Sequence, residues 1–171
     1  ELVAWDLMAQ AEHDEDASSI LISNTSEVIR EVKEIIKNEC SNLERAMIVK
    51  SSLKNNGLIV KIDNLKQAID LINRLAPEHL HMAFEGHEID INDLVAGIIL
   101  EGTDSAVSLS DYVLGPSHIL PTNSSARFSS PLSVEDFFIS SSKVAIKSES
   151  NKGLYNKLAE KTSLIARAEG L

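Results

Sequence analysis

The sequence has 171 residues, about one domain's worth at the usual ~100–200 residues per domain. Its 43% hydrophobic and 25% charged residues are typical of a globular protein and argue against a disordered one. The formal net charge of −10 and the aromatic content of 4% disfavour a nucleic-acid partner, because phosphates would be repelled and few rings could stack on bases.

Membrane insertion and disulfide formation are disfavoured as well. The longest apolar run, Leu94 to Leu100, is far shorter than the ~20 residues that cross a bilayer. The single cysteine, Cys40, excludes an internal disulfide and is compatible with a reducing cytosol, so we expect a cytoplasmic protein. The chain opens without a methionine or a signal segment, directly on a helix-like sequence, and we expect it to be a piece of a longer protein.

Short apolar runs bounded by polar residues predict three buried strands, at 19–23, 57–62 and 96–100. Helical patterns lie between them. Strands that alternate with helices of this length predict an α/β fold, with a parallel or mixed sheet flanked by helices.

Two of the helices have clear sequence boundaries. Apolar residues recur at helical spacing in 28–36 and again in 65–75, and Pro77 ends the second helix because the residue before a proline avoids the α region. Each helix follows an asparagine that has a glutamate or glutamine three residues later, the spacing of a capping box: Asn24 with Glu27, and Asn64 with Gln67.

The C-terminal part differs from the rest in composition. Residues 120–142 are rich in serine and include two prolines, which indicates a long excursion rather than core, and an amphipathic helix is predicted for 151–168. We place a boundary near residue 125. The prediction is an α/β domain at 1–125 and a C-terminal helical arm at 126–171 that reaches a partner subunit.

The first cluster of chemically useful residues lies near the end of the opening helix. Gln10 and His13 are three residues apart, so their side chains project from one helix face, and Asp6 lies on that face one turn earlier. An amide oxygen and an imidazole that converge in this way could share a metal ion. The alternative is an ordinary solvated polar face.

A second cluster follows Pro77. Glu78 and His79 stand where a strand would begin, and both can serve one pocket only if that pocket lies at the strand's end. Either side chain could act as a general base. Alternatively, Glu78 only caps the turn and His79 is an edge residue. His81 and His87 lie nearby without partners at ligand spacing, and we assign them no role.

Two further groups complete the candidates. A loop stiffened by one glycine and two prolines presents Asp111 and His118, which suits a carboxylate metal ligand and a hydrogen-bond donor to a substrate. Glu169 stands near the end of the last helix. In the alternative interpretation both are ordinary solvated polar residues. Together, the clusters supply the groups that a metal-assisted proton-transfer site needs.

At these residues the chain resembles the histidinol dehydrogenase family. The segments AQAEHD, LAPEHL, DYVLGPSHILPT, ARFSSPLSVEDF and AEGL occur in the family's order and at close to its spacing, over essentially the whole chain. The resemblance implies an incomplete Rossmann-like domain and a zinc-dependent homodimer. It also implies the oxidation of L-histidinol to L-histidine in two successive NAD-dependent steps of histidine biosynthesis.

The resemblance also implies roles for individual residues. Glu78 and His79 match the family's catalytic acid–base pair. The matches to zinc ligands are Gln10, His13 and Asp111, and the substrate-binding set comprises His13, His79, Asp111, His118 and Glu169.

The chemistry fits these residue types. A zinc ion can orient histidinol through its nitrogens, His79 would take the alcohol proton, and Glu78 would activate the water that hydrates the aldehyde. Our own addition from the helix face is that Asp6 orients Gln10 or His13 through the second coordination shell; a plain surface aspartate is the alternative.

Several features depart from the family pattern. The family's fourth zinc ligand is a histidine a few residues beyond AEGL, its NAD contacts lie before Glu1, and no glycine-rich dinucleotide fingerprint occurs here. Ser110 replaces the glycine that normally precedes the Asp-Tyr pair. We therefore expect the chain alone to be inactive. A catalytically dead scaffold or dimerisation module of the same ancestry, and a self-contained zinc hydrolase with Glu78 as base, are the alternatives.

Overall fold

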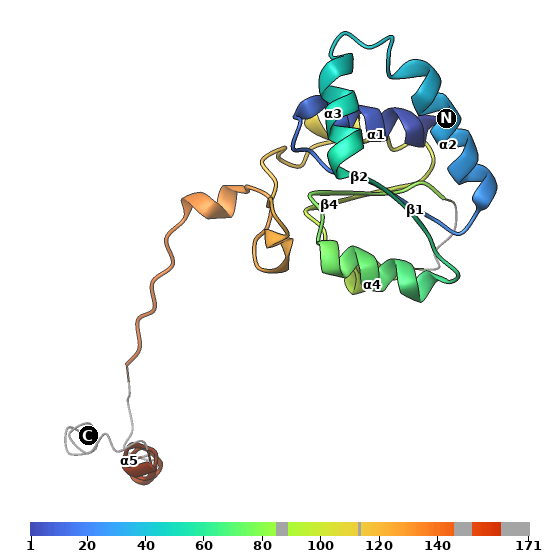
Figure 1. Ribbon diagram of the computed structural model, residues 1–171. Helices are drawn as coiled ribbons and strands as arrows, with labels where there is room; N and C mark the ends of the chain where they lie inside the picture. Colours follow the sequence, from blue (N-terminus) through green and yellow to red (C-terminus); the bar gives the residue numbers. More distant parts are fainter. Residues whose placement is uncertain (85–88, 113, 146–151, 162–171) are drawn as a thin grey trace. The chain divides into compact units, whose positions relative to one another are not determined.

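Two pairs of parallel strands form the centre of the first of two units in this computed structural model (Figure 1). The structure describes residues 1–84, 89–112, 114–145 and 152–161. The paired strands are β1 (Ser19–Ser23) with β2 (Gly57–Lys61), and β3 (His79–Met82) with β4 (Ile98–Glu101). The predicted α/β class and parallel pairing are therefore confirmed, and the three predicted strands occur with ends that differ by no more than two residues.

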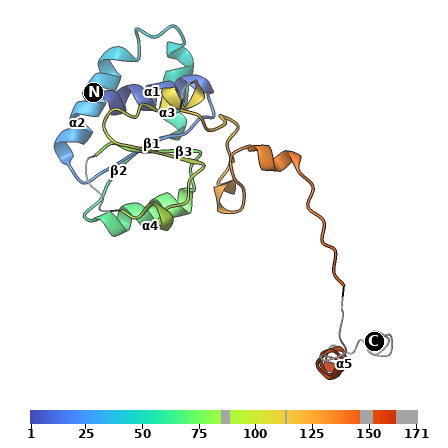
Figure 2. The same cartoon turned by 180° about the vertical axis from the view of Figure 1, so that it is seen from behind.

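Helices cover both faces of the strands, as the two opposite views show (Figure 1, Figure 2). On one side lie α1 (Leu2–His13), α2 (Ser26–Glu39) and α3 (Ala46–Asn56), and on the other lies α4 (Leu65–Leu75). The apolar side chains divide in the same way. One core cluster joins α4 to β3 around Ile72 and Met82, and another joins α1, β1 and α2 around Ala4 and Leu21.

The ends of α4 confirm the sequence prediction in detail. The Asn64 side chain accepts a hydrogen bond from the Gln67 backbone N–H at 3.1 Å. The helix ends at Leu75, and Ala76 adopts a left-handed conformation with φ of 43° before Pro77. This reversal brings the chain directly into β3, so it sets where Glu78 and His79 begin.

The predicted capping box of α2 is wrong. The helix begins at Ser26, Thr25 is its N-cap, and no side chain caps it. The Asn24 side chain instead accepts a hydrogen bond from the Thr25 hydroxyl at 3.0 Å, which takes its oxygen away from the helix. Helix α3 was not predicted, because its four consecutive apolar residues at 46–49 point to all sides of a helix and give no amphipathic pattern.

The remaining described segments contain only short 3₁₀ turns and one helix. The turns are η1 (Ile91–Asp93), η2 (Val107–Asp111), η3 (Ser125–Arg127) and η4 (Val134–Phe137). The first unit comprises 1–136 and the second 137–171, so residues 126–136, expected in the arm, make their contacts within the first unit. Helix α5 (Lys152–Lys161) lies inside the predicted 151–168 helix, whose part at 162–168 is outside the described residues. In the described chain, no helix is both long and apolar enough for a bilayer.

Candidate functional site

Helix α1 presents different chemistry on two opposite faces. Ala4, Met8 and Ala11 recur at helical spacing and are buried in the apolar clusters. At about 100° per residue, the opposite face carries three polar side chains, which are Asp6, Gln10 and His13. A helix that buries a carboxylate opposite its apolar face needs polar partners there, since an unpaired buried charge is costly.

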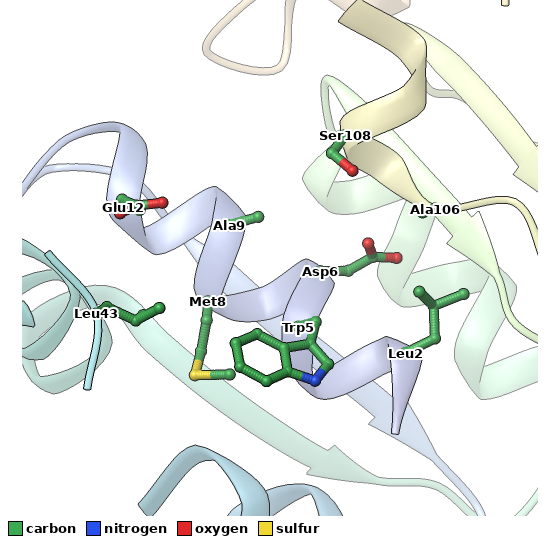
Figure 3. Close-up of a pocket in the computed structure, with 9 residues that line it drawn as sticks. All are labelled: Leu2, Trp5, Asp6, Met8, Ala9, Glu12, Leu43, Ala106 and Ser108. Atoms are coloured by element: carbon green, nitrogen blue, oxygen red, sulfur yellow. The ribbon is translucent and has the colours of Figure 1, made fainter. Parts of the chain in front are cut away.

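Asp6 finds these partners on two other elements. Its Oδ2 lies 2.7 Å from Nδ1 of His81 on β3, and its Oδ1 accepts a 3.1 Å hydrogen bond from the Val107 backbone N–H at the start of η2. Figure 3 shows the carboxylate directed towards the segment of Ala106 and Ser108, beside a shallow cleft of about 170 Å³. The expected hydrogen-bonding partners, Gln10 and His13, are not the ones that Asp6 binds.

His81 is the functional candidate that sequence reasoning missed. Its Nε2 donates to the Gly102 carbonyl at 2.9 Å, and its side chain is 8% exposed. The signal was present in the alternation of the strand, because His79 and His81 are two residues apart and face the same side of β3. Leu80 and Met82 point the other way, into the core cluster of α4.

His79 is the most unusual side chain in the described chain. Both ring nitrogens are buried, and neither has a hydrogen-bond partner. Burial lowers the pKa of His79 below its usual value near 6.5, while the charges of Asp111 and Glu78 oppose that shift and His13 adds to it. The structure therefore places His13, Glu78 and Asp111 close enough to act electrostatically on one neutral imidazole.

The turn that carries Glu78 is held tightly by its neighbours. The Gly97 N–H donates to the Pro77 carbonyl and the Ile98 N–H donates to the Glu78 carbonyl, both at 2.8 Å. A Cβ on Gly97 would lie 2.7 Å from the Glu78 carbonyl oxygen and 3.1 Å from the ring of Pro121. Only glycine allows this close approach. The Pro121 end of the loop that carries His118 therefore lies beside the Glu78 turn.

The C-terminal end of α4 is fixed from the same loop. The Ser124 hydroxyl donates to the Leu75 carbonyl at 2.6 Å, and the Arg127 guanidinium donates to the carbonyls of Asn73 and Arg74. These bonds satisfy helix carbonyls that have no partner within the helix. They also fix the position of the helix end from which the chain turns into Glu78 and His79.

The other predicted site residues differ in exposure. Gln10 is half-buried, whereas His13, Asp111 and His118 are exposed. Glu169 and His87 lie outside the described residues. Across the ranges that the structure describes, no three His, Cys, Asp or Glu side chains are grouped to hold a metal. The predicted zinc ligands include only two residues of those types, because the third donor is the amide of Gln10.

The arrangement has the components of a proton-transfer site. A buried neutral imidazole without partners can accept a proton from a bound substrate, and a half-buried carboxylate, Glu78, adjoins it in the chain. An amide oxygen, an imidazole and a carboxylate are donors that zinc accepts, and three protein ligands leave a position open for substrate. The donor types present therefore suit a zinc ion.

Comparison with known proteins identifies the family. The family model described as histidinol dehydrogenase matches residues 1–171. A histidinol dehydrogenase from Caldanaerobacter subterraneus subsp. tengcongensis is 48% identical over 136 residues, which cover 79% of this chain and 32% of that protein. One from Dehalococcoides mccartyi is 42% identical, covering 100% of this chain and 38% of that protein.

A solved structure agrees with these sequence matches. The crystal structure of histidinol dehydrogenase from Elizabethkingia anophelis matches with a TM-score of 0.85 and 32% identity, over 99% of this chain and 40% of that one. The chain thus spans about two fifths of the length of such relatives. From the family model, the sequence relatives and the shared fold together, we conclude that the chain belongs to the histidinol dehydrogenase family.

Proposed function

We propose that the protein carrying this chain oxidises L-histidinol to L-histidine in two steps, as an enzyme of histidine biosynthesis. The observation that supports this most directly is His79, whose two buried ring nitrogens have no partner and whose surroundings include Glu78, His13 and Asp111. Such a group is expensive to bury unless a ligand satisfies it, so it points to a bound substrate.

His79 is suited to the first proton transfer. Because burial lowers its pKa, the imidazole is neutral at physiological pH and can accept the proton of the substrate alcohol. NAD, when bound, would supply the hydride acceptor. Glu78 then removes a proton from the water that hydrates the intermediate aldehyde, which prepares the second oxidation.

Gln10, His13 and Asp111 are the residues that would hold the zinc ion. Gln10 and His13 lie one turn apart on α1, and Asp111 ends η2, which Asp6 fastens to the same helix. Bound zinc would supply a template that orients the substrate through its nitrogen atoms. His118 and Glu169 are proposed to bind the substrate as well.

We also propose that the protein acts as a homodimer, with the C-terminal arm reaching the partner subunit. Six apolar side chains between 128 and 144 are 72–98% exposed: Phe128, Val134, Phe137, Phe138, Ile139 and Val144. Apolar side chains concentrated in one exposed segment indicate a surface that another chain covers. A second copy of this chain is the occupant that the family resemblance favours.

The test is steady-state turnover of histidinol and of histidinaldehyde, followed as NADH, in the longest natural form of the protein with zinc present. His79→Asn should slow histidinol oxidation by about 10²–10⁴-fold, the usual contribution of a positioned base. Glu78→Gln should slow the aldehyde step most, because only that step needs an activated water. Asp70→Asn, an exposed carboxylate on α4, is the matched control and should be without effect.

Two outcomes would overturn the proposal. No NADH from the unaltered protein would favour the catalytically dead scaffold, and equal turnover in all three variants would exclude His79 and Glu78 from the chemistry. The 171-residue chain alone is expected to produce no NADH from histidinol, because it spans only about two fifths of the length of its relatives.

A further inference from the structure

We propose that Asp6 and His81 form a positioning pair that sets the geometry of the site proposed above, on which this inference rests. The pair is buried, with side chains 8% exposed for His81 and 10% for Asp6. Neither residue is proposed to touch the substrate. Each is close in sequence to residues of the proposed site, and together they join four separate elements of the fold.

Three hydrogen bonds form the joint between these elements. Asp6 on α1 contacts His81 on β3 at 2.7 Å and accepts from Val107 at the start of η2 at 3.1 Å. On its other side, His81 donates to Gly102, directly after β4, at 2.9 Å. One short chain of bonds therefore fixes the spacing between the helix, the two strands and the turn.

The position of one proton follows from its acceptor. A carbonyl oxygen can only accept, so Nε2 of His81 carries a proton towards Gly102. The carboxylate of Asp6 accepts from Val107 with one oxygen and binds Nδ1 of His81 with the other, so both partners of the pair are fixed at both ends. Charge-assisted bonds of this kind hold a geometry more firmly than neutral ones.

Each member of the pair controls a different part of the site. Gln10 and His13 follow Asp6 on the same face of α1, one and two turns later. His79 lies two residues before His81 on the same face of β3. Val107 opens the five-residue turn that Asp111 closes. A shift at the pair would therefore move zinc ligands and base relative to one another, and a misplacement of about 1 Å can cost ~10²-fold in rate.

A merely structural role makes a different prediction. In that case, loss of Asp6 would lower the melting temperature while the folded fraction kept its full kcat. Ser19→Ala is the matched control, because the Ser19 hydroxyl donates a 2.9 Å hydrogen bond to the Leu7 carbonyl and also ties α1 to the sheet. That bond involves neither Asp6 nor His81, so its loss loosens the helix without removing a bond of the pair.

Three variants of the longest natural form separate the two roles, measured by kcat, KM and melting temperature. Asp6→Ala should lower kcat by about 10–100-fold in the folded protein. Asp6→Asn should restore most of it, because the amide can accept from Val107 and donate to a neutral His81. The double variant Asp6→Leu/His81→Leu replaces both partners by apolar side chains, an exchange that often leaves stability nearly unchanged, and should lower kcat at least tenfold with little change in melting temperature.

The outcomes decide the proposal even if Asp6→Ala does not fold, since the double variant leaves neither the carboxylate nor the imidazole buried without its partner. Unchanged kcat in the folded double variant, or an equal loss of kcat in Ser19→Ala, would overturn the positioning role. If the unaltered protein does not oxidise histidinol, the proposed function fails instead. The joint itself is then tested by amide hydrogen exchange, which should rise at residues 108–111 in Asp6→Ala and stay unchanged in Ser19→Ala.

Discussion

Two regions depart from the usual pattern of buried apolar and exposed polar side chains: the corner where α1 meets β3, and the segment 128–144. The corner buries polar side chains, and the segment exposes apolar ones. At the corner, Asp6, His79 and His81 are polar side chains held away from water. In the segment, apolar side chains such as Phe138 and Ile139 are 72% and 98% exposed. In the cluster around Ile72 and Met82, by contrast, the apolar residues are buried as expected.

The two departures teach different things. Burying polar groups costs free energy that a folded chain recovers only through partners, and His79 lacks such partners within the described chain. Exposing rings costs free energy that only another surface can recover. The corner therefore indicates a small polar ligand, whereas the segment indicates a large apolar partner. The following predictions test each half of this comparison.

The largest effect is expected in the exposed segment. Replacing Phe137, Phe138 and Ile139 together by serine should weaken self-association by more than about a hundredfold, because burying each side chain is worth roughly 1.5–3 kcal/mol. Sedimentation or light scattering over a range of micromolar concentrations would show dimers in the unaltered protein and monomers in the triple variant.

Met47→Ser is the matched control for the segment. Met47 is 80% exposed, but it stands alone near the start of α3, so its loss should leave the dimer intact. A triple variant with the same mass as the unaltered protein at every concentration would show that these side chains do not carry the interface. The inference of an apolar partner for the segment would then be wrong, whereas the inference of a polar ligand at the corner would be unaffected.

A smaller effect is expected where the Glu78 turn approaches β4. Gly97→Ala would place a Cβ 2.7 Å from the Glu78 carbonyl oxygen, and the backbone would have to move to relieve the clash. We expect a loss of about 1–3 kcal/mol in the free energy of unfolding, as for other overpacked sites. Turnover should fall as well, because the displaced group belongs to the proposed base. Denaturant unfolding and NADH production measure the two effects.

Gly153→Ala is the control for the added methyl group. A Cβ at Gly153 would meet no atom within 4 Å, and alanine favours the helix α5 in which it lies. This variant should be as stable as the unaltered protein or slightly more stable. If Gly97→Ala were equally well tolerated, the close approach of Glu78, Gly97 and Pro121 would not be a constraint on the site.

The fold could be predicted from the sequence where periodicity and capping agree. The apolar runs at 19–23 and 57–62 and the Asn64 cap gave their elements directly, since each depends on local spacing. Helix α3 could not be predicted in this way, because its consecutive apolar residues at 46–49 do not recur at helical spacing. The first unit extends to residue 136 through contacts such as that of Arg127 with α4. Contacts between residues so far apart in sequence cannot be predicted from local patterns.

The site was less accessible to sequence reasoning. Local spacing on α1 correctly put Asp6 on the face of Gln10 and His13, but it favoured partners within the same helix. The actual partner, His81, is 75 residues away in sequence, and the distance between α1 and β3 is set by packing of the whole unit. A histidine two positions after His79 was the one available signal, because alternation puts both on one strand face.

The smallest effect concerns the pH dependence of stability. Since burial lowers the pKa of His79 in the folded state, the unfolded chain binds a proton near pH 6.5 that the folded chain does not yet accept. Stability should therefore fall as the pH drops through about 6.5, by at most about 1.4 kcal/mol per pH unit, and this residue should contribute nothing to the change above that range. His79→Asn should lack this part of the slope.

Denaturant unfolding at pH 7.5 and 5.5 gives the measurement as a difference between the two proteins, in which the common titration of the carboxylates cancels. Ser19→Ala removes no titratable group and serves as the control, so it should keep the slope of the unaltered protein. If His79→Asn kept that slope too, the pKa of His79 would be the same in the folded and the unfolded protein. The polar corner would then be open to water, and the need for a ligand to satisfy His79 would disappear.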